Sequence, residues 1–324
     1  MYKNRLAFAL LVIIYFFPTS NTFAQTENKE ALDKAVSGII LRGIGPAVMG
    51  GRIADIAVSP TDKSTWYVAV GSGGLWKTTN RGTSWEPIFD SQKSYSIGTV
   101  TIDLNNSEVV WVGTGENVSG RHVAWGDGVY KSADGGKTWK QMGLEKSEHI
   151  GKILVDPRNS DVVFVAAEGP LWSAGGERGV YKTDDGGKTW QLVLEIDENT
   201  GVTDMEFDPS NPDIIYAAAY QRRRHTWSLL AGGPKSGIYK SVDNGASWNQ
   251  VKTGLPNGDI GKIGLAVTPA NSELVYATIE ANDKDKGFYR SLNKGESWEK
   301  QNSYISGGTG PHYYQEIEAS PENP

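Results

Sequence analysis

The sequence contains no cysteine among its 324 residues. This absence excludes disulfide bonds, thiolate metal ligands and a cysteine nucleophile, so the fold must depend on core packing. Histidine is scarce, and the four residues at 122, 149, 225 and 312 show no metal-ligand spacing, so we expect neither a metal site nor a cofactor. No large excess of one charge is present: a formal net charge of −6 argues against nucleic acid as a partner.

Long hydrophobic runs are missing beyond the N-terminus. The longest apolar run, residues 6–17, follows Lys3 and Arg5 and precedes small residues. It is shorter than the about 20 residues that a spanning helix needs, and its flanks are typical of a signal peptide. We predict a signal peptide at 1–24, a linker at 25–40, a secreted or periplasmic protein, and no membrane insertion after cleavage. An uncleaved N-terminal anchor is the alternative.

Glycine, with 39 residues, and tryptophan, with 11, are abundant, and both recur in one octet. Each copy has Ser or Thr first, Asp or Asn third, Gly fifth and Trp last. The five copies span residues 78–85, 132–139, 183–190, 241–248 and 291–298. A repeat of roughly fifty residues is typical of a propeller or a solenoid.

Each octet lies inside a longer unit, shown here by the third. An alternating strand at 152–155 leads to a turn rich in Asp, Pro and Asn, and an apolar strand follows at 162–165. A variable loop then leads to a third strand at 179–182, directly before the octet. We call these strands A, B and C, and the strand after the octet D. Four antiparallel strands per period are a propeller blade.

The repeats predict an all-β fold, an incomplete β-propeller of four-stranded antiparallel blades. It should occupy residues 41–324, with five blades and the first strand of a sixth at 314–324, and with no helix longer than two turns. A fragment of a longer protein would explain the extra strand. The alternative is a five-bladed ring closed by residues 38–45.

The octet has the composition of a tight turn between strands C and D. Gly at the fifth position adopts positive φ without steric cost, and the Asp or Asn can accept hydrogen bonds from backbone amides of the turn. We therefore interpret Asp134, Asp185 and Asp243 as structural rather than catalytic. The closing tryptophans should be largely buried between blades.

Strand order decides which loops share a face. Because neighbouring strands alternate in direction, the octets lie at one end of every blade and the B–C loops at the other. The loops at 117–127, 170–178 and 222–236 are long, whereas the first blade has almost none. Variable loops on a rigid scaffold usually carry function, and Trp and Arg are favoured in binding sites. The predicted ligand-binding residues are Glu116, Arg121, His122, Trp125, Glu168, Trp172, Arg178, Gln221, Arg222, Arg223, Arg224 and Trp227.

The octets resemble the Asp-box, or bacterial neuraminidase repeat, and the longer units resemble sortilin-type propeller proteins. The resemblance spans roughly residues 40–324. Many bacterial members of that group are named glycosyl hydrolases. The resemblance implies a secreted propeller that binds a protein or peptide, or acts as a scaffold, through its B–C loops. The alternative is a glycoside hydrolase acting on polysaccharide, with part of its site in further C-terminal blades.

No catalytic residue is predicted. Xyloglucanase-type propellers carry a catalytic acid just before the Gly-Gly of their first blade, but here Gly71 and Ser72 occupy that place. Sialidases need three separated arginines, for which Arg52, Arg121 and Arg178 are available, but their opening arginine motif is absent. The acids Glu116 and Glu168 are interpreted as salt-bridge partners of nearby arginines. The run at 222–224 is either an anion-binding element or a solvated loop.

Overall fold

The computed structural model describes residues 31, 34, 35, 37, 51–305, 310, 313 and 315–324. The chain divides into two units, Met1–Met49 and Gly50–Pro324. The predicted signal peptide lies outside the described residues, as does most of the predicted linker; the four described residues of the first unit are helical. No helix of the described part is long and apolar enough to cross a membrane.

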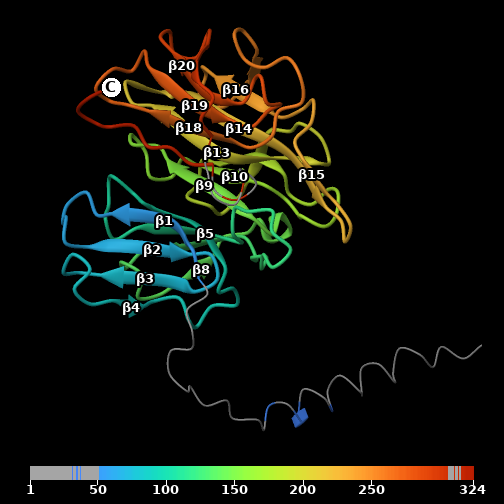
Figure 1. Ribbon diagram of the computed structural model, residues 1–324. Helices are drawn as coiled ribbons and strands as arrows, with labels where there is room; N and C mark the ends of the chain where they lie inside the picture. Colours follow the sequence, from blue (N-terminus) through green and yellow to red (C-terminus); the bar gives the residue numbers. More distant parts are fainter. Residues whose placement is uncertain are drawn as a thin grey trace, which may run out of the picture. The chain divides into compact units, whose positions relative to one another are not determined.

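The second unit consists of five antiparallel sheets, each built from strands that are consecutive in the chain (Figure 1). Three sheets contain β1 (Ile53–Val58), β2 (Trp66–Val70), β3 (Gly74–Thr78) and β4 (Glu86–Pro87); β5 (Ile97–Ile102), β6 (Val110–Thr114), β7 (Val129–Ser132) and β8 (Lys140–Gln141); and β9 (Ile150–Val155), β10 (Val163–Ala167), β11 (Gly179–Thr183) and β12 (Gln191–Leu194). The other two contain β13 (Thr200–Asp208), β14 (Asn211–Arg224), β15 (Leu229–Ala231), β16 (Gly237–Ser241) and β17 (Asn249–Val251); and β18 (Ile263–Val267), β19 (Val275–Ile279), β20 (Gly287–Ser291) and β21 (Glu299–Asn302).

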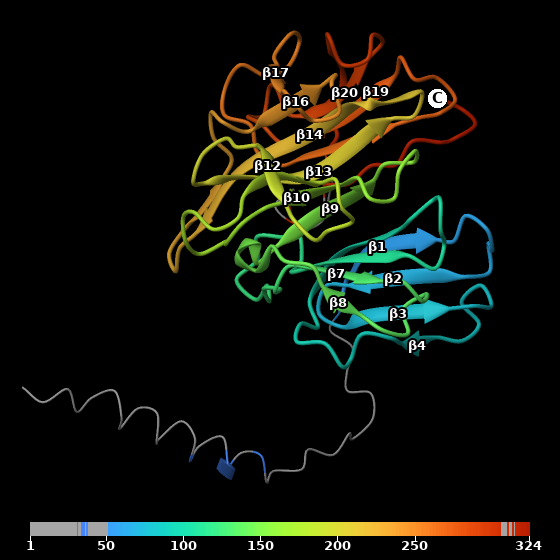
Figure 2. The same cartoon turned by 180° about the vertical axis from the view of Figure 1, so that it is seen from behind.

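This architecture confirms the predicted all-β fold of four-stranded antiparallel blades. Between residues 51 and 305 the one helical element is the single 3₁₀ turn η1 (Glu145–Ser147). The fourth sheet has a fifth strand, because β15 pairs with the end of β14. Figure 2 shows this β14–β15 hairpin extending beyond the rest of the fourth sheet.

The blades pack face to face through apolar clusters. Each of the four described clusters combines side chains of two successive sheets. A large aromatic residue on strand B of one blade contacts the fifth-position glycine in the octet of the following blade, as Trp111 contacts Gly187 and Phe164 contacts Gly245. A Cβ on Gly187 would lie 2.7 Å from the Trp111 ring, so only glycine allows this close approach.

The octet turns are built alike in all five blades. In the second, the Ser132 hydroxyl donates to Asp134 at 2.8 Å and accepts the Gly136 amide at 2.8 Å, while the Thr138 amide donates to Asp134 at 2.9 Å. The fifth-position glycines all have positive φ, between 78° and 92°. The predicted local bonding of the turn is therefore confirmed.

The prediction that all five closing tryptophans are largely buried is wrong for the first. Trp298 is 5% exposed, and the indoles of Trp139 and Trp190 donate to carbonyls of the preceding blade, at Ile88 and Met142. Trp85 is 40% exposed. A closing tryptophan contacts the blade before its own, and no blade precedes the first within residues 51–305.

The predicted first strand of a sixth blade forms no ladder. Residues 315–320 lie beside β18: the Gln315 carbonyl fills the space beside Gly264, and the Thr268 hydroxyl donates to the Ser320 carbonyl at 2.6 Å. Strand A normally pairs with strand B of its own blade, as β18 does with β19. No described residue supplies that partner, so the segment occupies the place of a strand without its hydrogen bonds.

Candidate functional site

The B–C loops lie where the repeats predict, with one correction in the fourth blade. Residues 222–224 are not a loop, because β14 continues through Arg224 and pairs with β15. Side chains alternate along a strand, so Arg222 and Arg224 turn inward and are 1% and 9% exposed, while Arg223 is half-buried. The amide of Arg224 donates to the Leu171 carbonyl at 2.9 Å, which ties the hairpin to the third blade.

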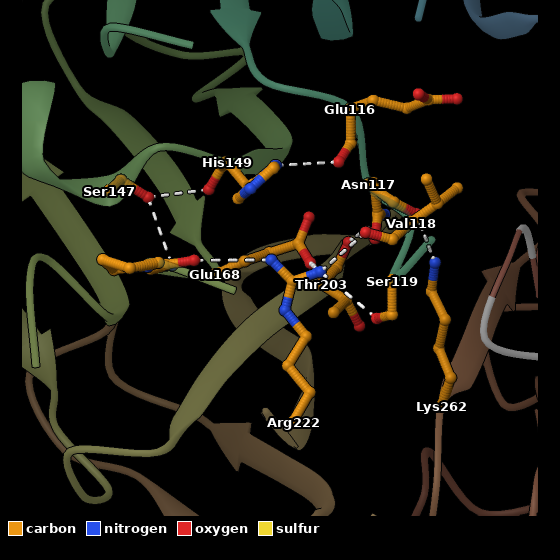
Figure 3. Close-up of polar contacts among 12 residues, drawn as sticks. Glu116, Asn117, Val118, Ser119, Ser147, His149, Glu168, Thr203, Arg222 and Lys262 are labelled. Carbon is orange, nitrogen blue, oxygen red and sulfur yellow. Dashed lines mark hydrogen bonds and ion pairs between the residues drawn. The ribbon is translucent and has the colours of Figure 1, made fainter. Parts of the chain in front are cut away.

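Residues 116–119, at the start of the second blade's B–C loop, form a buried segment that blades four and five hold in place (Figure 3). The Lys262 amine donates to the Asn117 carbonyl at 2.7 Å, and the Arg222 guanidinium donates to the Val118 carbonyl at 3.1 Å. The side-chain amide of Asn117 donates to the Thr203 carbonyl at 3.0 Å. We call residues 116–119 the plug; it fixes the base of the loop that carries Trp125.

Two predicted acids are buried and paired with arginine, as the salt-bridge interpretation expects. Glu116 binds Arg52, and Glu168 lies 3.0 Å from Arg222, with both side chains 1% exposed. Burial raises the pKa of Glu168, and the Arg222 charge opposes that rise. The Glu116 carboxyl also fills the space beside Gly71, so a side chain at position 71 would clash with it.

Arg178 is a structural residue of the third blade's loop. Its guanidinium donates to the carbonyls of Glu168, Pro170, Ser173 and Gly175. Burial, followed by the neighbouring arginine charges, lowers its pKa to about 10. Because its donors are engaged and the side chain is buried, Arg178 shapes the loop rather than presenting a charge to a ligand.

The remaining predicted residues lie nearer the surface. The rings of Trp125, Trp172 and Trp227 are 65%, 41% and 82% exposed, each on the loop of a different blade. His225 stacks on Trp227 with ring centroids 5.6 Å apart. Arg121 and His122 are exposed, whereas Gln221 and Arg223 are half-buried. Three successive blades thus present indole rings on one face.

Two half-buried acids on this face have raised pKa values. Burial raises the pKa of Glu280, and a hydrogen bond from the Lys262 backbone amide together with the Lys262 charge opposes that rise. Burial also raises the pKa of Glu148. Glu148 also has a φ of 62°, which is uncommon outside glycine. Glu280 directly follows strand B, so its position can be found from the repeat pattern. Glu148 lies between blades, and nothing in the repeat pattern marks it.

The inner strands of all five blades carry a second polar cluster, lined also by the segment 315–318. The amides of Val100 and Leu265 donate to Asp55 and Asp204, so these two acids link neighbouring blades. The charged residues of this inner cluster are Asp55, Lys152, Asp204, Glu206, Lys262, Glu316 and Glu318. No group of acids and histidines in the described residues is arranged to hold a metal ion.

The five sheets define the class: the chain is a β-propeller of four-stranded blades, and its likeness to sortilin-type propellers with glycoside hydrolase relatives is confirmed. The family model described as sortilin, neurotensin receptor 3, matches residues 127–230. The chain is 24% identical over 259 residues to xyloglucanase Xgh74A of Acetivibrio thermocellus, covering 70% of this chain and 28% of that protein. An oligoxyloglucan-reducing end-specific xyloglucanase of Emericella nidulans is 22% identical, covering 62% and 24%. The chain therefore spans about a quarter of the length of these relatives.

Solved structures show the same fold. An ancestral GH74 enzyme superposes with a TM-score of 0.62 at 21% identity, covering 88% of this chain and 35% of that one. The GH74 xyloglucanase from Xanthomonas campestris gives 0.51 at 15% identity, covering 78% and 46%. YCF48 bound to D1 peptide gives 0.50 at 16% identity, covering 80% and 70%. At these identities the likeness concerns the fold alone.

Proposed function

We propose that this chain is the secreted propeller of a polysaccharide-binding protein and that the chain of sugars lies across its B–C face. One observation carries the proposal: Trp125, Trp172 and Trp227 expose their rings on three successive blades. An indole offers a large, flat apolar surface that packs well on the C–H face of a sugar ring. Exposed apolar groups gathered on one face of a soluble protein usually mark a binding surface.

The scaffold beneath these rings favours a preformed site. The plug is tied to blades four and five by Asn117 and Lys262, and the hairpin that carries Trp227 is tied to blade three by the Arg224 amide. Rings held on a rigid frame lose little conformational entropy on binding. The similarity to xyloglucanases supports a polysaccharide, and the N-terminal apolar run supports secretion.

Hydrolysis is the second candidate function. The half-buried acids Glu148 and Glu280 face the same end of the blades, and burial raises the pKa of both. A carboxyl that stays protonated near neutral pH can act as a general acid in glycoside cleavage. In the described residues Glu116 and Glu168 are less suited, because both are buried against arginine.

A protein or peptide ligand, the first interpretation of the sequence, has less support. The sortilin match covers residues 127–230 only, and the likeness to YCF48 concerns the fold. Flat indoles separated along several blades suit a linear polymer of rings better than a short peptide strand, which needs a free sheet edge or an apolar pocket.

Titration of the purified chain with polysaccharides, by calorimetry or affinity electrophoresis, tests the proposal. Xyloglucan, mannan, xylan and polygalacturonate serve as probes, and at least one should bind. Trp227→Ala and Trp125→Ala should each weaken that binding about tenfold or more, the loss expected of an aromatic hot spot. Lys137→Gln, on an octet, is the control and should bind normally. Tryptophan variants that bind as tightly as the parent chain would refute the site.

Release of reducing ends from the bound polymer tests the second candidate. If the chain cleaves, Glu280→Gln or Glu148→Gln should abolish the activity while leaving binding intact. Activity that survives in both variants would exclude these acids as proton donors.

A further inference from the structure

The three consecutive arginines of β14 have three different surroundings. Arg222 pairs with Glu168, and Arg223 donates to the Asn199 side chain at 2.6 Å. Arg224 forms no ion pair among the described residues, although it is 9% exposed and its Nε has no hydrogen-bond partner. A buried guanidinium without a carboxylate is costly, so this arrangement needs an explanation.

The groups around Arg224 add positive charge rather than neutralise it. Its pKa is lowered first by burial and then by the charge of Arg121, and the other groups that act on it are the phenols of Tyr313 and Tyr220. Arg121 is exposed and, like Arg224, has no acidic partner in the described part of the chain. The stretch 306–314, which includes Tyr313, contains no Asp or Glu. The Arg222 guanidinium, two residues earlier on β14, donates to the Val118 carbonyl at 3.1 Å, so β14 passes beside the loop that carries Arg121. Two guanidinium groups without a carboxylate partner in the described residues thus lie on neighbouring segments of a protein whose net charge is negative.

Both segments also carry aromatic rings. On the loop of Arg121, His122 lies against Tyr313 with ring centroids 6.1 Å apart, and the exposed Trp125 follows. On the β14–β15 hairpin, Arg224 is followed in the chain by the stacked pair of His225 and Trp227. An anion attached to a flat ring would satisfy both features, since guanidinium forks bind carboxylates in two-point contacts and indoles stack on the ring.

We infer that Arg121 and Arg224 form a subsite for a carboxylate carried by a sugar ring, so that the polysaccharide accepted by this face is a polymer containing uronic acid. This inference rests on the proposed function and narrows its substrate class. A sugar carboxylate fits better than the side chain of an acidic peptide, because the flanking indoles would have no ring to stack on in a peptide.

Binding measurements with three polymers test the inference: polygalacturonate, neutral xyloglucan and poly-glutamate. The parent chain should bind polygalacturonate at least tenfold more tightly than xyloglucan, and poly-glutamate weakly. Arg121→Gln should reduce binding of polygalacturonate on the order of tenfold or more, the loss expected for a charged hydrogen bond, with no effect on xyloglucan. Lys137→Gln removes the same charge from an octet and should change neither.

Arg121 is the principal site of mutation because its exposed side chain can be replaced without disturbing the fold. Arg224→Lys keeps the charge but loses the fork, and should lose part of the preference. Xyloglucan binding that equals that of polygalacturonate, with Arg121→Gln unaffected, would overturn the inference and leave the proposed function standing. Poly-glutamate bound as tightly as polygalacturonate through the same arginines would also overturn it. If xylan or mannan binds but polygalacturonate does not, the inference alone fails; if none of the four polysaccharides binds, the proposed function fails with it.

Discussion

The octet turns and the B–C face contain similar residue types that behave in opposite ways. In the octets the acids are partly or fully exposed and hydrogen-bonded by their own turn, and side-chain and backbone bonds from Thr138 lower the pKa of Asp134 to about 2. On the B–C face the acids are buried or half-buried, and burial raises the pKa of Glu148, Glu168 and Glu280. The polar groups of the octet turns have hydrogen-bond partners, whereas the B–C face keeps charged groups buried at a cost in folding free energy.

The tryptophans differ in the same way. Two octet indoles hydrogen-bond to carbonyls of the preceding blade, Trp139 to Ile88 and Trp190 to Met142, and so help to hold blades together. Those of the B–C loops expose their rings, with Trp227 at 82%. A regular spacing thus marks residues that build the repeat, and an irregular spacing marks residues that are available to a ligand. The following predictions can break or sharpen this contrast.

The buried charge pair on the B–C side should give the largest effect. Arg222→Met should destabilise the chain by about 3–5 kcal/mol, because Glu168 would remain buried without its partner. The double change Glu168→Leu with Arg222→Met should recover much of that loss. Urea denaturation of the three proteins measures this, and an Arg222→Met variant within about 1 kcal/mol of the parent chain would contradict the account.

On the octet side, burial should decide how much each tryptophan contributes. Trp298→Ala should cost about 3–5 kcal/mol, because its ring is 5% exposed between two blades. Trp85→Ala, at 40% exposure, should cost clearly less. Thermal unfolding of the two variants is the measurement. Equal losses would mean that the first octet is packed as tightly as the last.

The close approach of aromatic rings to the octet glycines should give a smaller effect. Gly187→Ala should destabilise by about 2–3 kcal/mol, since its Cβ would combine a φ of 92° with a contact on Trp111. Gly175→Ala is the matched control: its φ is 73°, but nothing lies within 4 Å of the added Cβ, so about 1 kcal/mol is expected. A control as damaging as Gly187→Ala would show that backbone strain alone is responsible.

The inner cluster, between the two faces, should give the smallest effect, seen as a pH dependence. Burial raises the pKa of Glu206 and of Glu316 to about 7. A carboxyl whose folded pKa is raised stabilises the fold fully below its unfolded pKa and loses that contribution as pH rises through the folded value. The melting temperature should therefore fall between pH 5.5 and pH 8. Glu206→Gln should flatten this profile, and an unchanged slope in that variant would assign it to other groups.

Much of the fold was predictable from the sequence because it depends on local chemistry. The octet specifies its own turn through Ser132, Asp134 and Gly136, and the same pattern recurs in every blade. Two details were decided by neighbours: Trp85 is exposed and no blade precedes its own within residues 51–305, and residues 315–320 form no ladder because no described residue supplies a strand B.

The candidate site was predictable as a face and not as a set of contacts. Strand order assigns Trp125, Trp172 and Trp227 to the B–C loops of three successive blades, and all three side chains are exposed. The different surroundings of Arg222 and Arg224 depend on β14 continuing through Arg224, four residues beyond its last apolar residue, Tyr220, which nothing local signals. The contact of Arg222 on β14 with Val118, at the start of the loop that carries Arg121, joins segments about a hundred residues apart in the chain, and only the folded chain shows it.

The central claim is that the octets build the blades and the B–C loops bind the ligand. Hydrogen–deuterium exchange with and without bound polysaccharide tests it most directly. Polygalacturonate and xyloglucan fragments would be used separately. Binding should slow exchange at residues 118–127, 170–178 and 222–236 and leave the five octets unchanged. Protection confined to the octets, or protection absent from the B–C loops when a fragment binds, would place the functional face at the opposite end of the blades.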